Sequence, residues 1–137
     1  MANENRLLTT QSREEFARWY ASALEQRRQD LLTRIELADS IEKRFAVLVV
    51  LLYPENQGRY KALQHDTGNS VRASHWNHVT LGKQRITSRM IQLFGGAYPQ
   101  FIFWMTTGIE NEQHQGPRGL VDAYMEVCEK PRIKRLF

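Results

Sequence analysis

Apolar residues recur at helical spacing through the first part of the chain. Thr10 or Ser12 can cap a helix there, and two glutamates follow in what would be its first turn. The apolar positions after them are Phe16, Trp19, Tyr20, Ala23, Leu24, Leu31 and Ile35. This spacing predicts one amphipathic helix over residues 13–37. Its opposite face carries charges of both signs and is expected to be solvated.

A more uniformly apolar segment begins after Asp39 or Ser40 and ends at Pro54. Its run "FAVLVVLLY" is apolar on nearly every side, which is typical of a helix at the centre of a core. The β-branched "VLVV" makes a buried strand the competing interpretation. Because no second segment alternates as a partner strand would, we expect a helix.

Short helical segments separated by turn residues follow. A helix over residues 59–66 is predicted to end in the turn "TGNS". Residues 71–80 form the next helix, with apolar positions at Val71, Ala73, Trp76 and Val79, and Gly82 can end it. Thr87 or Ser88 then caps a helix through Phe94, before the break "GGAYP".

The last third contains one more apolar helix and a polar connector. The segment "QFIFWMTTG" predicts a helix ending at Gly108, and Trp76 and Trp104 are expected in the core. Residues 110–119 are polar and turn-rich, and "LVDAYMEVCE" after them predicts a short docking helix that Pro131 stops. We therefore expect an all-α fold in three parts: residues 1–40, residues 41–108, and residues 109–137 with their basic tail.

Composition is consistent with an ordinary globular domain. The chain has 137 residues, of which 42% are hydrophobic and 25% charged, enough for one core. Cys128 is the only cysteine, so an intrachain disulfide is excluded and a reducing compartment is favoured. The first residues lack the apolar core of a signal peptide, and the longest apolar run is too short to span a bilayer. We expect a cytoplasmic protein without a membrane partner.

The excess of basic over acidic residues is concentrated in the second half of the chain. Residues 1–58 carry 8 basic and 9 acidic groups, whereas residues 59–137 carry 11 and 6. Within residues 59–89 the only acidic residue is Asp66, against six lysines and arginines. Such a local excess of positive charge can attract a polyanion.

The predicted helix over residues 71–80 exposes side chains that suit base recognition. Arginine pairs with guanine, asparagine pairs with adenine, and serine or histidine can bond either kind of base edge in the DNA major groove. Residues of these types are Arg72, Ser74, His75, Asn77 and His78. Candidate phosphate contacts around them are Arg59, Lys61, Lys83, Gln84, Arg85 and Thr87.

The stretch "SHWNHVTLGKQRIT", followed by "YPQFIFWMTTG", resembles the Xre family of Cro and lambda-repressor type helix-turn-helix regulators. The resemblance covers residues 41–108 and is strongest from Trp76 to Gly108. It implies a lambda-repressor-like bundle in which residues 59–67 form the scaffold helix and residues 71–80 the recognition helix. The segment "RYKALQHDTG" departs from the Gln-rich scaffold helix of the family, and the turn "GNS" is longer than usual.

The resemblance implies a sequence-specific regulator that binds double-stranded DNA, acts as a dimeric repressor and needs no cofactor. Dimers of this kind match paired half-sites, so a dimerising element outside the DNA-binding unit is expected. The first candidate is the N-terminal helix, through Phe16, Trp19, Tyr20 and Leu24, and the helix over residues 120–129 is the second. The alternative is a protein-interaction module that uses the same aromatic face to modulate another regulator.

Catalysis and metal binding are not expected. The sequence contains no Gly-rich phosphate loop, no nucleophile motif and no carboxylate pair on an apolar face. His75 and His78 lie three positions apart, but the sequence places no third metal ligand near them. We therefore expect neither an enzyme nor a metalloprotein.

Overall fold

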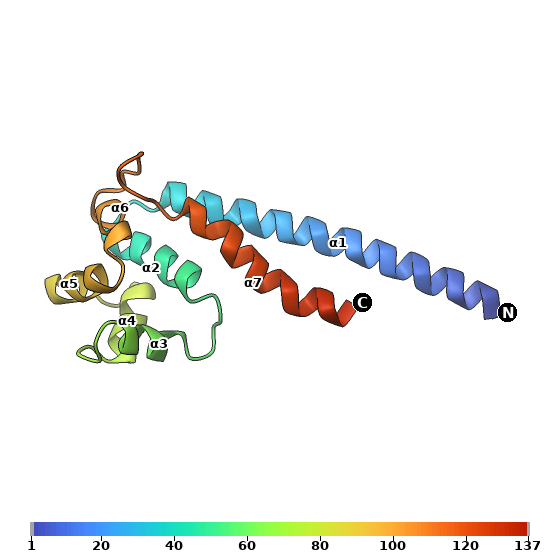
Figure 1. Cartoon of the computed structure of the whole chain (residues 1–137), viewed down its shortest axis with the longest axis horizontal. Helices are drawn as coiled ribbons and strands as arrows, with labels where there is room; N and C mark the ends of the chain where they lie inside the picture. The colour runs from blue at the N-terminus through green and yellow to red at the C-terminus, as the bar shows by residue number, and fades with distance from the viewer. Residues whose placement is uncertain (1, 137) are drawn as a thin grey trace.

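The structure is a computed structural model that describes the backbone of residues 2–136 and the side chains of residues 10–128. Its elements are α1 (Ala2–Leu37), α2 (Ile41–Leu52), α3 (Arg59–Asp66), α4 (Ala73–Thr80), α5 (Ser88–Ala97), the 3-10 turn η1 (Pro99–Phe101), α6 (Ile102–Thr107) and α7 (Arg118–Leu136). Residues 2–136 contain no strand, so the predicted all-α fold is confirmed. Figure 1 shows a compact body of α2 to α6 from which α1 projects.

Three aromatic rings form the centre of the body. Phe45 of α2, Trp76 of α4 and Phe94 of α5 have no exposed surface. The Phe45 ring lies 5.5 Å from Trp76 and 5.3 Å from Phe94, centroid to centroid. Rings at these separations gain attraction beyond the area they bury. The apolar helix predicted for "FAVLVVLLY" is therefore the central element of the core, as expected.

Helices α1 and α7 lie side by side and run in opposite directions (Figure 1). Arg27 of α1 donates a hydrogen bond to the Tyr124 hydroxyl at 3.0 Å, and Arg28 pairs with Asp122 at 2.8 Å. Leu31 and Ile35 of α1 and Val121 and Tyr124 of α7 belong to the same buried cluster as the central rings. All three predicted parts of the chain therefore share one core.

Two helix starts differ from the predicted ones. Helix α1 begins at Ala2 rather than at residue 13, because residues 2–12 contain no glycine or proline that would interrupt it. Helix α4 begins at Ala73 rather than at residue 71, because Arg72 has extended backbone angles, φ −66° and ψ 147°. The side chain of Arg72 thus precedes the helix instead of lying on its face.

Two helix ends also differ. Helix α5 runs through Gly95 and Gly96 to Ala97, whereas the sequence predicted its end at Phe94. A Cβ at Gly95 would lie 3.2 Å from Ile102, so the glycine permits a close approach of α5 and α6. Helix α7 continues past Pro131 to Leu136, and the predicted stop at the proline is wrong. The missing N–H of proline removes one helical hydrogen bond without ending the helix there.

No helix in the described part of the chain is long and apolar enough to cross a membrane. Helix α7 begins at Arg118, two residues before the predicted start, and η1 precedes α6 where the sequence predicted a single helix. The other boundaries agree with the sequence. Helix α3 occupies the predicted range, Ser40 caps α2, and Thr87 caps α5. Gly108 follows α6 with a left-handed φ of 77°, the conformation expected of a glycine that ends a helix.

Candidate nucleic-acid interface

Helix α4 buries one face and exposes the other. Trp76 and Val79 are 0% and 1% exposed, and they anchor the helix to the body. Ser74, His75 and His78 are exposed on the outer side. Ser74 and His78 are four positions apart and His75 and His78 three, so the three side chains are neighbours on one helical surface. They make no hydrogen bond to any other described residue and are available to a ligand.

The remaining two predicted base-reading residues flank this surface. Arg72 is exposed at the start of α4, and Asn77 is half-buried at the edge of its inner face. Neither side chain has a hydrogen-bond partner within the described part of the chain. The structure therefore brings the five predicted residues to one end and one side of α4, with Asn77 the least accessible of them.

Gln64 of α3 holds the first turn of α4 in place. Its side-chain oxygen accepts a hydrogen bond from the Ala73 N–H at 2.8 Å, because Arg72 offers no capping side chain. An N–H in the first turn of a helix has no partner inside the helix, so Gln64 supplies the missing acceptor from a neighbouring helix. The sequence did not predict this role, because the partner of Gln64 is a backbone N–H nine positions later in another helix.

The connection between α3 and α4 uses two consecutive residues of positive φ. Gly68 has φ 94° and Asn69 has φ 61°, and the Asn69 N–H bonds the Gln64 carbonyl at 2.9 Å. Thr67 is buried and donates its hydroxyl to the Leu63 carbonyl at 2.8 Å. Asparagine tolerates the left-handed region better than most residues, which suits it to this position. These bonds fix the conformation of the turn, which determines the orientation of α4 relative to α3.

A short loop after α4 exposes further basic groups. Gly82 has φ 74°, and the Lys83 N–H returns to the His78 carbonyl at 2.9 Å, which ends the helix sharply. Lys83 and Arg85 are exposed in this loop, and Gln84 is half-buried. The two cationic side chains form no ion pair with another described residue. They are free to contact a phosphate.

Other candidate phosphate contacts differ in their availability. Lys61 is exposed on α3. Arg59 is half-buried, and its Nε donates to the Tyr53 carbonyl at 2.7 Å, where α2 ends. The Thr87 hydroxyl accepts from the Met90 N–H at 3.1 Å and so caps α5. Arg59 and Thr87 therefore have structural roles. Arg89, which was not among the predicted phosphate contacts, is exposed in the first turn of α5 and adds a cation to this region.

The electrostatic character of this region is uniform. Residues 67–109 include four lysines and arginines and no aspartate or glutamate. Asp66, at the end of α3, and Glu110 flank this segment along the chain, and the Asp66 carboxylate accepts a hydrogen bond from the Tyr53 hydroxyl at 2.6 Å. That bond and the neighbouring His65 lower the pKa of Asp66. Residues 67–109 therefore carry an excess of positive charge, and Glu42 of α2 is the acidic residue that lines a pocket together with Lys83 and Arg85 of the loop.

The predicted partner residues on α1 differ in exposure. Phe16 and Trp19 are exposed, by 44% and 63%, and their ring centroids lie 5.6 Å apart. Tyr20 is only 8% exposed, and Leu24 is half-buried.

Among the described residues no cluster of three potential metal ligands occurs. Comparison with known proteins adds nothing to this picture, since no family model, curated protein or solved structure matches the chain.

Proposed function

We propose that the chain is a sequence-specific regulator that binds double-stranded DNA, with α4 as the helix that enters the major groove. The observation that carries the proposal is the outer surface of α4. Ser74, His75 and His78 lie there without partners in the described part of the chain, and Arg72 adjoins them. An α-helix fits the major groove, and these side chains have the donors and acceptors that read base edges.

Cationic side chains on the elements that precede and follow α4 support the proposal. Lys83 and Arg85 follow α4 directly, and Arg89 and Lys61 lie on the neighbouring helices. Phosphate contacts of this kind supply affinity and fix the register of a protein on DNA, and base contacts add the preference for sequence. The resemblance to Xre regulators agrees with this division of roles. The protein would act by occupying an operator as a dimer, and so repress, without catalysing a reaction.

Binding of a duplex at several salt concentrations tests the proposal. We expect the logarithm of the association constant to fall linearly with the logarithm of salt concentration, because phosphate contacts release counterions. Arg72→Ala should weaken binding to a preferred sequence, whereas Arg18→Ala should leave binding unchanged. Arg18 is a matched control because it is an exposed arginine on α1. Binding that is insensitive to salt, or an equal loss of DNA affinity in Arg72→Ala and Arg18→Ala, would contradict the proposal and favour a protein-interaction module.

A further inference from the structure

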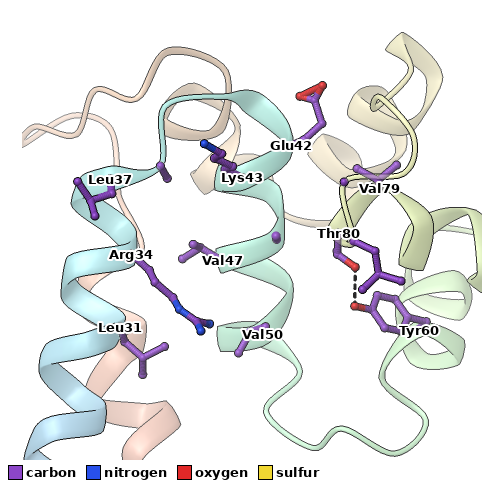
Figure 2. A pocket seen from close by; sticks show the side chains of 14 residues that line it. Leu31, Arg34, Leu37, Glu42, Lys43, Val47, Val50, Tyr60, Val79 and Thr80 are labelled. Atoms are coloured by element: carbon purple, nitrogen blue, oxygen red, sulfur yellow. Dashed lines mark hydrogen bonds between the residues drawn. The ribbon is translucent and has the colours of Figure 1, made fainter.

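An apolar groove lies beside α4, and no residue in the described part of the chain covers it. It has a volume of about 490 Å³ and is bounded by the end of α1, by α2 and by the end of α4 (Figure 2). Val47 and Val50 of α2 contribute to its lining. Leu37 of α1 and Leu81 at the end of α4 line it as well and are 69% and 58% exposed. Exposed leucines bordering an apolar groove are typical of a contact surface.

The groove also contains a cation without a partner. The Arg34 guanidinium extends from α1 toward α2 in Figure 2, and the side chain is exposed. Arg34 makes no ion pair with any residue from 10 to 128. Lys43, which also lines the groove, is paired with Asp39 at 2.8 Å. The Glu42 carboxylate of α2 also lines the groove and forms no ion pair with a described residue. The apolar walls and the Arg34 guanidinium suit an aromatic ring, since a ring can bury its edge and present its face to the cation.

The same helix exposes such rings near its middle. Phe16 and Trp19 belong to α1, the helix that projects from the body in Figure 1, and both side chains are exposed. At about 100° per residue, their side chains fall in the same sector of α1, about 60° wide, as four other residues. These four are Ala23, Asp30, Arg34 and Leu37, and all six side chains are exposed. We call this set the α1 stripe.

The spacing of the α1 stripe is complementary to itself. When two copies of α1 pack in opposite directions with Trp19 opposite Arg34 of the partner subunit, the same register places Phe16 opposite Leu37. It also places Ala23 opposite Asp30. Because the pairing is reciprocal, each contact occurs twice around a two-fold axis that passes between residues 26 and 27. The two symmetry-related contacts between Trp19 and Arg34 then lie about 22 Å apart along the helix axes.

We propose that two copies of this chain associate through antiparallel α1 stripes, each inserting Trp19 into the groove of the other beside Arg34. The occupant of the groove is therefore a second copy of the chain. The arrangement covers the exposed leucines, the exposed tryptophan and the free guanidinium together. Its use in reading a paired operator rests on the proposed function, but the association itself needs no DNA.

The mass of the full chain in solution, measured by sedimentation equilibrium, tests the association. We expect a dimer whose dissociation constant rises about tenfold or more in Trp19→Ala and in Arg34→Ala, because each removes both copies of the contact. Arg18→Ala is the matched control, since Arg18 is exposed on α1 outside the stripe. Circular dichroism verifies that each variant keeps its helices. A monomeric wild-type chain, or unchanged association of Arg34→Ala, would overturn the proposal.

Disulfide trapping tests the register. In a Cys128→Ser background, the double variant Ala23→Cys with Asp30→Cys should form a covalent dimer, and neither single variant should. The two positions lie about 10.5 Å apart along one helix, beyond the reach of a disulfide within the chain. Cross-linking of Ala23→Cys alone would indicate parallel helices and overturn the proposed register. If the chain forms this dimer but binds no DNA, the proposed association holds and the proposed function fails.

Discussion

The Nε atom of Arg44 in α2 donates a hydrogen bond to the backbone carbonyl of Met105, 2.7 Å away and 61 positions later in the sequence. Another nitrogen of the same guanidinium donates to the carbonyl of Ala38 at 3.1 Å. Both carbonyls lie at helix ends, where they have no partner inside the helix and where positive charge is favourable. Arg44, which is only 8% exposed, therefore joins α2 to the ends of α1 and α6.

Replacement of Arg44 by methionine should destabilise the protein strongly. The apolar side chain fills similar space but leaves the Met105 carbonyl, which is in a buried bond, and the Ala38 carbonyl, which is in a partly buried one, without this donor. The loss costs about 2–4 kcal/mol of the free energy of unfolding. Denaturant unfolding measures this loss. Arg44→Lys is the control, because an ammonium can satisfy one carbonyl and should recover part of the loss. A change below about 1 kcal/mol in Arg44→Met would show that the carbonyls find other donors.

Gln64→Leu should loosen the first turn of α4. The substitution removes the acceptor of the Ala73 N–H, and a lost helix cap costs about 1 kcal/mol. Thermal unfolding measures this effect. Gln64→Glu keeps an oxygen at the same place and should retain the stability of the wild type. If both variants unfold at the same temperature, the capping role of Gln64 is wrong.

The Tyr53 and Asp66 pair predicts a dependence of stability on pH. The hydrogen bond from Tyr53, and His65 beside it, lower the pKa of Asp66 below its usual 3.8. Because the folded pKa is the lower one, the contribution to stability is present above pH 3.8 and is lost as the pH falls through the folded value. An NMR titration should therefore show a rise in the pKa of Asp66 in Tyr53→Phe. An unchanged pKa would contradict this assignment.

Burial raises the pKa of Tyr53 itself above its usual 10.0, and the hydrogen bonds to Asp66 and Tyr98 act in the same direction. A folded pKa above the unfolded one contributes stability below pH 10.0 that is lost at higher pH. The wild type should thus lose stability in alkali more steeply than Tyr53→Phe. Denaturant unfolding on both sides of pH 10.0 measures the difference. Equal slopes would exclude Tyr53 as the titrating group.

Lys83→Ala and Arg85→Ala should weaken binding to every DNA sequence by a similar factor. Each removes one candidate phosphate contact, so the slope of log affinity against log salt should decrease by about 0.9 per variant. Fluorescence anisotropy at several salt concentrations measures the slope. Arg18→Ala again serves as the control. A slope that stays at the wild-type value would exclude a phosphate contact by that residue.

Local patterns predicted most of the fold. Helical spacing located α2, α3 and α6 and placed Trp76 and Trp104 in the core, because these features depend on neighbouring residues. The roles of Arg44 and Gln64 were not predictable in this way. Arg44 bonds a carbonyl 61 positions away, and Gln64 bonds an amide nine positions away in another helix. Contacts of this kind exist only once the helices have packed.

The candidate site was predicted to a similar extent. The alternation of polar and apolar residues identified the exposed surface of α4, and glycine chemistry identified the turn at Gly82. The structural role of Arg59 was missed because its acceptor, the Tyr53 carbonyl, is a backbone atom that sequence patterns do not reveal. The burial of Tyr20 was not predicted, because an aromatic stripe does not show which of its members are covered in the folded chain.

Selection of binding sites from a library of random duplexes tests the central claim most directly. The purified chain is equilibrated with the library near physiological salt, and the bound sequences are read. We expect an enriched inverted repeat for the wild type, and loss of the motif with residual salt-sensitive binding when Arg72, Ser74 and His78 are replaced by alanine together. Absence of any enriched motif for the folded wild-type chain would contradict the proposal that α4 reads DNA.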